Sequence, residues 1–159
     1  MASRKIEDLI EPLQIQYREF ADKMIERGLL FIVVCTARHV SEQRALYAQG
    51  RHCLNSVNIL RAEAGLPPIT EIENRCKVTW TRKSKHLVDK DHPKSEAFDI
   101  ALKAEINGIM KVHWDVKIDS NQNGISDYLE AGEIGESVGL KWGGRFSSPD
   151  YPHYEYIEK

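Results

Sequence analysis

The order in which helix-like and strand-like apolar patterns follow one another is the feature that most constrains the fold of this chain. Apolar residues recur at three- and four-residue steps between Pro12 and Gly28, which predicts an amphipathic helix that begins at the proline and ends at the glycine. The continuous apolar run at residues 29–35 predicts a buried strand, and the polar residues 36–40 predict a loop. The predicted fold therefore begins with a helix and a strand.

A second helix and several strands are predicted farther along the chain. This helix is expected to have Ser41 as its N-cap and to end at Gly50. Residues 51–76 show only weak periodicity, so we expect an irregular segment that lines or covers a functional site. The remaining predictions are strands at 78–81, 97–102, 111–116 and 153–157 and a helix at 128–138. Helices followed mostly by strands predict an α+β fold, with N-terminal helices packed on an antiparallel sheet.

The size and charge of the chain restrict its organisation and its partners. With 159 residues, 42% of them hydrophobic, we expect a single domain over residues 1–159. The net charge of −2 and the lack of a dense Lys/Arg block argue against nucleic-acid and membrane-surface partners. No signal-peptide core or membrane span is recognisable. We therefore expect a monomer that is made in the cytoplasm without a signal peptide or membrane anchor.

The spacing of the cysteines does not indicate a cysteine-based functional site. Cys35, Cys53 and Cys76 are odd in number and far apart, without a Cys-x-x-Cys pair. This spacing argues against a disulfide framework and against a zinc site made of thiolates. We expect three reduced, part-buried thiols.

Three side chains have the chemistry of a catalytic zinc site, namely His86, Asp99 and His153. Such a site takes about three His or carboxylate ligands and leaves one position open. Asp99 is the most informative, because a carboxylate between Phe98 and Ile100 on a core strand needs a partner such as a divalent metal. Each residue alone could instead be structural, for example a histidine satisfied by hydrogen bonds. Their joint occurrence predicts a zinc cleft at the sheet face.

Two further acids lie close to His153. Asp150, three residues before it, can take a proton from an attacking water, whose pKa zinc lowers towards about 7. Glu155 follows His153 by two residues, on the same face of the predicted strand, and could orient a ligand or contact the substrate. We predict that Asp150 is the general base.

Three short motifs contain these candidates: Ser-Lys-His at 84–86, Ala-Phe-Asp at 97–99 and Asp-Tyr-Pro-His-Tyr-Glu at 150–155. Together they resemble the M15 zinc peptidases and, more narrowly, the phage L-alanyl-D-glutamate endolysins. The resemblance spans most of the chain from Thr36 onward, since it includes further segments at 36–38, 42–51, 132–135 and 139–144.

The resemblance implies roles for particular residues. The three candidate ligands would bind zinc, Asp150 would be the catalytic acid/base and Ser84 would line the substrate cleft. Arg38 would polarise the scissile carbonyl, and a fixed guanidinium facing a developing oxyanion is strongly stabilising. By default, however, an arginine at the end of a strand is merely solvated.

One feature of the motif leaves an alternative ligand open. Thirteen residues separate His86 from Asp99, which is more than in the compact form of the family motif. His92, seven residues before Asp99, has the compact spacing. We favour His86, because a serine stands two residues before it as in the family motif.

Residues 119–130 match a second metal-binding pattern, the twelve-residue calcium loop. Gly124 stands at position six, where the loop turns sharply. The alternative is a polar turn before a helix whose N-terminus favours acidic residues. The predicted calcium ligands are Asp119, Asn121, Asn123, Ile125 through its carbonyl, Asp127 and Glu130.

The family resemblance implies a zinc metallopeptidase of bacterial peptidoglycan. The expected reaction is hydrolysis of the bond between L-Ala and D-Glu in stem peptides, by an endolysin that a bacteriophage lysis system releases to the cell wall. One alternative is a D-Ala-D-Ala carboxypeptidase of the same family. Another is a catalytically silent wall-binding module that retains the metals, although such a module would not need an acid at Asp150.

Overall fold

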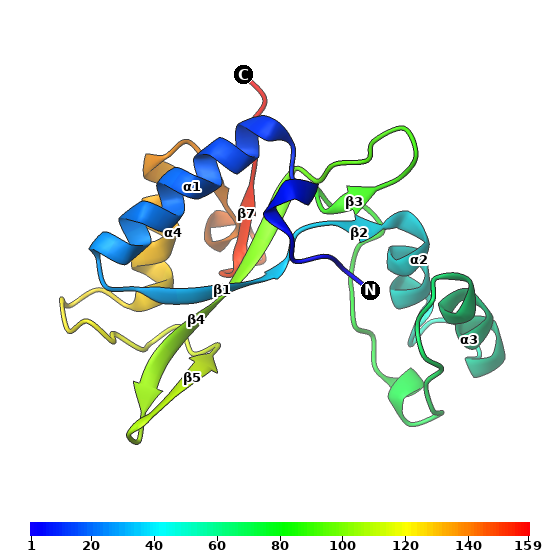
Figure 1. The fold of residues 1–159 in the computed structure, drawn as a ribbon. Helices are drawn as coiled ribbons and strands as arrows, with labels where there is room; N and C mark the ends of the chain where they lie inside the picture. The colour runs from blue at the N-terminus through cyan, green and yellow to red at the C-terminus, as the bar shows by residue number, and fades with distance from the viewer.

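The computed structural model describes residues 1–159 and contains an antiparallel sheet with helices packed on it and a further pair of helices beside it (Figure 1). Four strands of the sheet lie side by side in the order β1 (Leu30–Cys35), β4 (Ala97–Ile106), β7 (His153–Glu155) and β6 (Lys141–Trp142). The fifth, β5 (Ile109–His113), pairs with the C-terminal half of β4. β4 is therefore the central strand of the sheet.

The hydrophobic core lies between this sheet and two helices, α1 (Glu11–Glu26) and α4 (Asp127–Ser137), which pack on each other. Phe20 of α1 contacts Phe98 of β4 and Tyr154 of β7, with ring centroids 5.7 and 5.0 Å away. Phe98 and Tyr154 are fully buried and stack on each other. Aromatic pairs of this kind stabilise beyond the area they bury, so these rings fix β4 and β7 against the helices.

A second group of elements lies beside the sheet. In it, α2 (Val40–Ala48) packs on α3 (Leu54–Glu63), and β2 (Arg38–His39) forms a short parallel pair with β3 (Leu87–Val88). No residue of these four elements belongs to the main core cluster. The chain also has three 3₁₀ turns, η1 (Ile6–Asp8), η2 (Glu73–Arg75) and η3 (Gly143–Arg145).

The predicted α+β fold is confirmed, including the antiparallel sheet. The predicted helices at 12–28 and 128–138 correspond to α1 and α4, and the strands at 97–102 and 153–157 correspond to β4 and β7. The strand predicted at 111–116 lies slightly earlier in the chain, where β5 spans Ile109–His113. Most of the elements that form the core were therefore predictable from periodicity.

The strand predicted at residues 29–35 is present as β1, but the prediction that it is buried is wrong. β1 is an edge strand, and Leu30 and Ile32 are 49% and 38% exposed. An edge strand has a neighbour on one side only, so its apolar side chains are only partly covered. Continuous apolar character therefore does not prove that a strand is central.

Other local predictions also fail. Residues 51–76 are not irregular throughout, since they contain α3, and residues 78–81 form no strand. The loop predicted at 36–40 contains the short strand β2. The N-cap of α2 is His39, whose side chain accepts the N–H of Ser41.

No helix combines the length and the apolar character needed to cross a membrane. The three cysteines are free, as predicted, but Cys53 and Cys76 are exposed and Cys35 is buried. The expectation of three part-buried thiols is therefore wrong.

Candidate metal centre

The register of three adjacent strands brings the central residues of the site together. Asp99 of β4 pairs with Cys35 of β1 on one side and with His153 of β7 on the other. Side chains alternate between the two faces of a strand. Because Phe98 and Tyr154 face the helices, Asp99 and His153 point to the opposite face of the sheet.

His86 reaches this face from the chain just before β3. Its Nε2 atom lies 3.0 Å from Asp99 Oδ1 and 3.1 Å from His153 Nδ1, and the last two atoms are 2.8 Å apart. A tetrahedral zinc ion about 2.0 Å from each ligand atom would hold such atoms about 3.3 Å apart. The triangle is close to that geometry, so these three residues fit a zinc ion.

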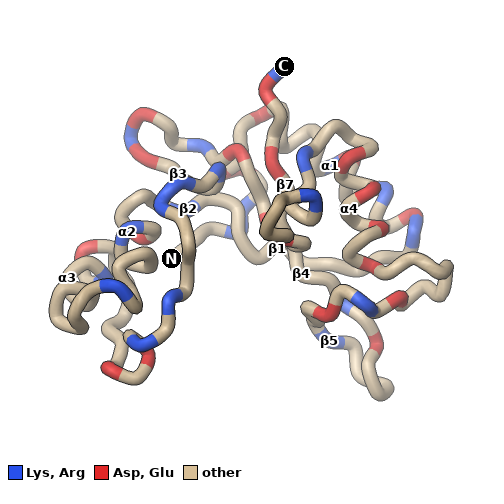
Figure 2. Tube along the Cα trace, turned by 180° about the vertical axis from the view of Figure 1, so that it is seen from behind, with Lys and Arg blue, Asp and Glu red and all other residues tan.

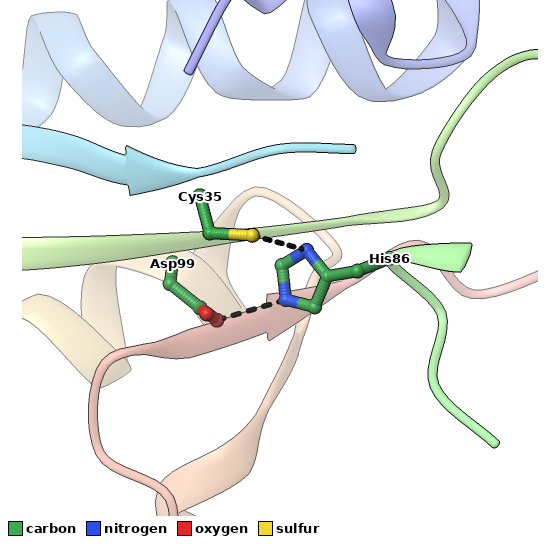
Figure 3. A group of neighbouring side chains, drawn as sticks. All are labelled: Cys35, His86 and Asp99. Atoms are coloured by element: carbon green, nitrogen blue, oxygen red, sulfur yellow. Dashed lines mark hydrogen bonds and ion pairs between the residues drawn. The ribbon is translucent and has the colours of Figure 1, made fainter. Parts of the chain in front are cut away.

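The far nitrogen of His86 fixes the orientation of its ring. Nδ1 donates to the carbonyl oxygen of Thr36 at 2.7 Å, which leaves the lone pair of the neutral ring on Nε2. Cys35 Sγ lies 3.5 Å from the same Nδ1 atom, on the side of the ring away from Asp99 (Figure 3). Cys35, His86 and Asp99 have possible ligand atoms within 4.8 Å of one another, yet the thiol faces the wrong nitrogen to share an ion with Nε2.

No motif or spacing in the sequence indicated that Cys35 lies at this site. The thiol contacts the candidate ligand His86 only because β1 shifts register between Val33 and Cys35, opposite β4. A bulge of this kind changes which side chains meet across a sheet and leaves no clear trace in an apolar run. Only the strand pairing would have revealed that Cys35 lies beside His86.

His153 is oriented in the same way by a carboxylate. Its Nε2 donates to Glu155 Oε1 at 3.0 Å, so Nδ1 keeps its lone pair toward Asp99. Glu155 is itself 3.6 Å from Lys141 Nζ. An acid that holds the outer nitrogen of a metal-binding histidine fixes the tautomer and makes the ring a better ligand.

Contacts within the triangle shift the pKa of each member. Burial lowers the pKa of His86, but hydrogen bonds to Asp99 and Cys35 outweigh it and raise the pKa to about 10. Burial also lowers the pKa of His153, and hydrogen bonds to Asp99 and Glu155 raise it to about 9. Burial raises the pKa of Asp99, while its bonds to both histidines bring that pKa far below the usual value. The carboxylate thus favours positive charge beside it, carried by protons or by a metal.

Asp150 lies in the same cleft, which has a volume of about 480 Å³. Its main-chain N–H donates to the carbonyl of Gly143, and its carbonyl accepts the N–H of His153. Burial and the nearby charge of Asp99 raise the pKa of the Asp150 carboxyl. A carboxyl whose pKa is raised toward neutrality is suited to exchange protons.

Arg38 and Ser84 also line the cleft. Arg38 Nη1 donates to Gln43 Oε1 at 2.9 Å, and its Nε lies 4.0 Å from Glu42 Oε1. Gln43 and Glu42 belong to α2, so this helix positions the guanidinium. Ser84 accepts the main-chain N–H of His86 at 3.3 Å.

The alternative ligand His92 lies outside this cluster. Its side chain is 83% exposed and 3.6 Å from Asp89, within the turn that precedes β4. It does not line the cleft that contains the triangle. The geometry therefore brings His86, and not His92, to Asp99.

The predicted calcium loop is wrapped around Glu130, which is 2% exposed. The amides of Asn121 and Asn123 both donate to Glu130 Oε2 at 2.9 Å. Asp119 accepts the main-chain N–H groups of Asn123 and Gly124. Four of the residues at ligand positions are therefore linked by hydrogen bonds.

The other two predicted calcium ligands have different surroundings. The N–H of Ile125 donates to the side chain of Asn123. Asp127 accepts the N–H of Ser120 at 2.8 Å, and its second oxygen lies 3.6 Å from Nε2 of the buried His113. Asp127 therefore joins the loop to the end of β5.

Two histidines and an aspartate on the open face of a sheet, with a further acid and an arginine in the same cleft, are typical of metallopeptidases. In comparisons with known proteins, residues 91–156 match a peptidase M15 family model described as D-alanyl-D-alanine carboxypeptidase. The matched region includes Asp99, Asp150 and His153. The chain is therefore similar to M15 peptidases over the region that contains these candidate site residues.

One relative covers more of the chain. The peptidoglycan L-alanyl-D-glutamate endopeptidase CwlK of Bacillus subtilis (strain 168) is 31% identical over 132 residues. The aligned region is 82% of this chain and 63% of the relative. The chain therefore spans less than two thirds of the length of that relative.

Proposed function

We propose that this protein is a zinc-dependent peptidase that cleaves peptidoglycan stem peptides between L-Ala and D-Glu. The observation that carries the proposal is the triangle of His86 Nε2, Asp99 Oδ1 and His153 Nδ1 in a cleft that also contains Asp150. The printed activity of the Bacillus relative supports the bond that is proposed.

Each residue of the cleft has a separate task in this proposal. His86, Asp99 and His153 hold the zinc ion, which supplies Lewis-acid chemistry when bound. Asp150 takes a proton from the attacking water and returns it to the leaving amine, a use consistent with the raised pKa of its carboxyl. Arg38 stabilises the negative charge that develops on the carbonyl oxygen.

The test of this assignment is Asp150→Ala. We expect the variant to lose turbidity-clearing activity on purified cell walls while it keeps zinc, because Asp150 is not a ligand. Asp22→Ala is the matched control, since Asp22 is an exposed acid of α1 far from the triangle in sequence and absent from the cleft lining. Full activity of Asp150→Ala would refute its role as general base.

The scissile bond requires its own experiment, because the matching family model is described as D-alanyl-D-alanine carboxypeptidase. Mass spectrometry of digested wall fragments separates the two reactions. A new D-Glu amino terminus supports the endopeptidase, whereas release of free D-alanine supports the carboxypeptidase.

The resemblance to phage endolysins extends the proposal to a lytic role at the wall. We expect the purified protein to lyse cells whose wall is accessible from outside. Lysis by the wild type but not by Asp150→Ala would support this role. Cleavage of isolated walls without lysis of such cells would contradict it.

We further propose that the loop at 119–130 binds calcium. Support comes from its ligand spacing and from the convergence of Asn121 and Asn123 on the buried Glu130. Calcium should raise the melting temperature of the zinc-loaded protein. Glu130→Gln should abolish this rise, whereas Glu133→Gln, an exposed position of the same helix, should retain it. An unchanged melting temperature of the wild type would contradict calcium binding.

A further inference from the structure

One wall of the cleft is formed by residues 78–81, 83 and 84, which belong to a basic stretch of the chain. Between residues 74 and 88 the sequence has five Lys and Arg residues and no acid, although the whole chain has a net charge of −2. Figure 2 shows blue segments and no red ones along the chain that leads into β3. Of the lysines and arginines in this stretch, only Lys85 forms an ion pair, with Glu96. The remaining lysines and arginines have no acidic partner, although Lys77 and Arg82 lie over the rings of Trp80 and Tyr47.

Lys83 is the free cation of the cleft. Arg38 and Lys83 are the only Lys or Arg residues in its lining, and Arg38 is held by side chains of α2. The Lys83 side chain is exposed and makes no hydrogen bond or ion pair. Its main chain, however, is fixed by Thr81, whose Oγ1 accepts the Lys83 N–H at 2.9 Å and donates to the Lys83 carbonyl at 2.7 Å. The Lys83 ammonium is thus exposed on a turn whose main chain is fixed by hydrogen bonds.

The proposed substrate carries a charge that this lysine can bind. A glutamyl residue has two carboxyl groups, of which one continues the peptide and the other remains free close to the scissile amide. The cleft also contains the acids Asp150 and Glu155, which repel that free carboxylate. A cation close to the free carboxylate would offset this repulsion and favour binding in the productive orientation.

We infer that Lys83 is a specificity residue, which binds the free carboxylate of the D-glutamyl residue next to the scissile bond. This inference rests on the proposed function. The ammonium forms a charge-assisted hydrogen bond with the carboxylate and thereby selects acidic over amidated stem peptides. Arg38, which is buried more deeply and held by Gln43, remains directed to the scissile carbonyl.

Two synthetic peptides test the inference. They are identical stem peptides in which the D-glutamyl residue carries either the free carboxylate or its amide. For the zinc-loaded wild type we expect kcat/KM to be about five- to tenfold higher on the acid than on the amide. Lys83→Gln should lose this preference, mainly through KM, and Lys83→Arg should restore it. Lys90→Gln removes a charge from an exposed lysine outside the cleft and should leave the preference unchanged.

The outcomes of this experiment distinguish the role of Lys83 from the proposed function. The preference should also weaken at high ionic strength, because an exposed ion pair is screened by salt. Cleavage of the amide peptide by Lys83→Gln shows that this variant is folded. A Lys83→Gln variant that keeps the preference, or a wild type without one, would overturn the role of Lys83 alone. A wild type that cleaves neither peptide would refute the proposed function itself.

Discussion

At the scale of single residues, the site depends on groups behind the ligands as much as on the ligands. Thr36 and Glu155 occupy the outer nitrogens of His86 and His153, so the inner nitrogens keep their lone pairs toward Asp99. A main-chain carbonyl can only accept, and a carboxylate accepts far more readily than it donates. When a metal binds, each ring therefore gives up the proton of its inner nitrogen, which faces Asp99.

Glu155→Gln should weaken zinc binding without removing a ligand. The amide can still accept from His153 Nε2, but it lacks the negative charge that makes the ring a better ligand, and we expect affinity to fall about 10- to 100-fold. Competition with a chelator of known zinc affinity measures the effect. Glu158→Gln, an exposed acid three residues farther on, is the control. Equal affinities of both variants would contradict the role of Glu155.

The stability of the metal-free protein should depend on pH in a definite direction. In the folded chain, the pKa values of His86 and His153 are raised from 6.5 to about 10 and about 9. Protonation therefore favours folding, and the stabilisation is complete below pH 6.5 and is lost as pH rises through 9 to 10. Thermal unfolding in the presence of chelator should show a falling melting temperature over this range. Asp99→Asn should flatten the dependence, and His92→Asn should leave it intact.

At the scale of elements, the candidate ligands could be predicted from the sequence, but the strand pairing that brings them together could not. Asp99 was identifiable because a carboxylate stands between two core residues, and His153 because an acid precedes it closely. The pairing of β4 with β1 and β7 depends on long-range packing, which no local pattern encodes. The same reason explains why the contact of Cys35 with His86 was missed. Weak periodicity likewise concealed α3, whose buried residues are few.

The turn η3 determines where Asp150 lies. A Cβ atom on Gly143 would be 2.4 Å from the Asp150 carbonyl oxygen and 3.0 Å from the Cβ of His153. Gly143→Ala must therefore displace the segment that carries both residues, and we expect activity on walls to fall at least tenfold. Gly108→Ala is the control, because its Cβ would meet no atom, although its positive φ costs about 1 kcal/mol of stability. Full activity of Gly143→Ala would show that the base tolerates displacement.

At the scale of the whole molecule, the triangle joins the two parts of the structure. Asp99 and His153 belong to the large sheet, whereas His86 belongs to the chain next to β3, outside the main core cluster. The main-chain N–H of Arg38 in β2 donates to the carbonyl of His86, which ties that ligand to the group containing α2 and α3. A shared ion would therefore hold the helical group against the sheet.

Removal of zinc should thus lower global stability as well as activity. A ligand at 100 times its Kd stabilises the folded state by about 2.7 kcal/mol, which corresponds to about 5–10 °C in melting temperature for a chain of this size. We expect this loss on chelation and its recovery when zinc is restored. Asp150→Ala should show the full zinc-dependent rise, because it keeps all three ligands, and Asp99→Asn should show little. A rise in Asp99→Asn equal to that of the wild type would mean that the stabilising ion binds elsewhere, and the triangle would lose its assignment as the site that joins the two parts.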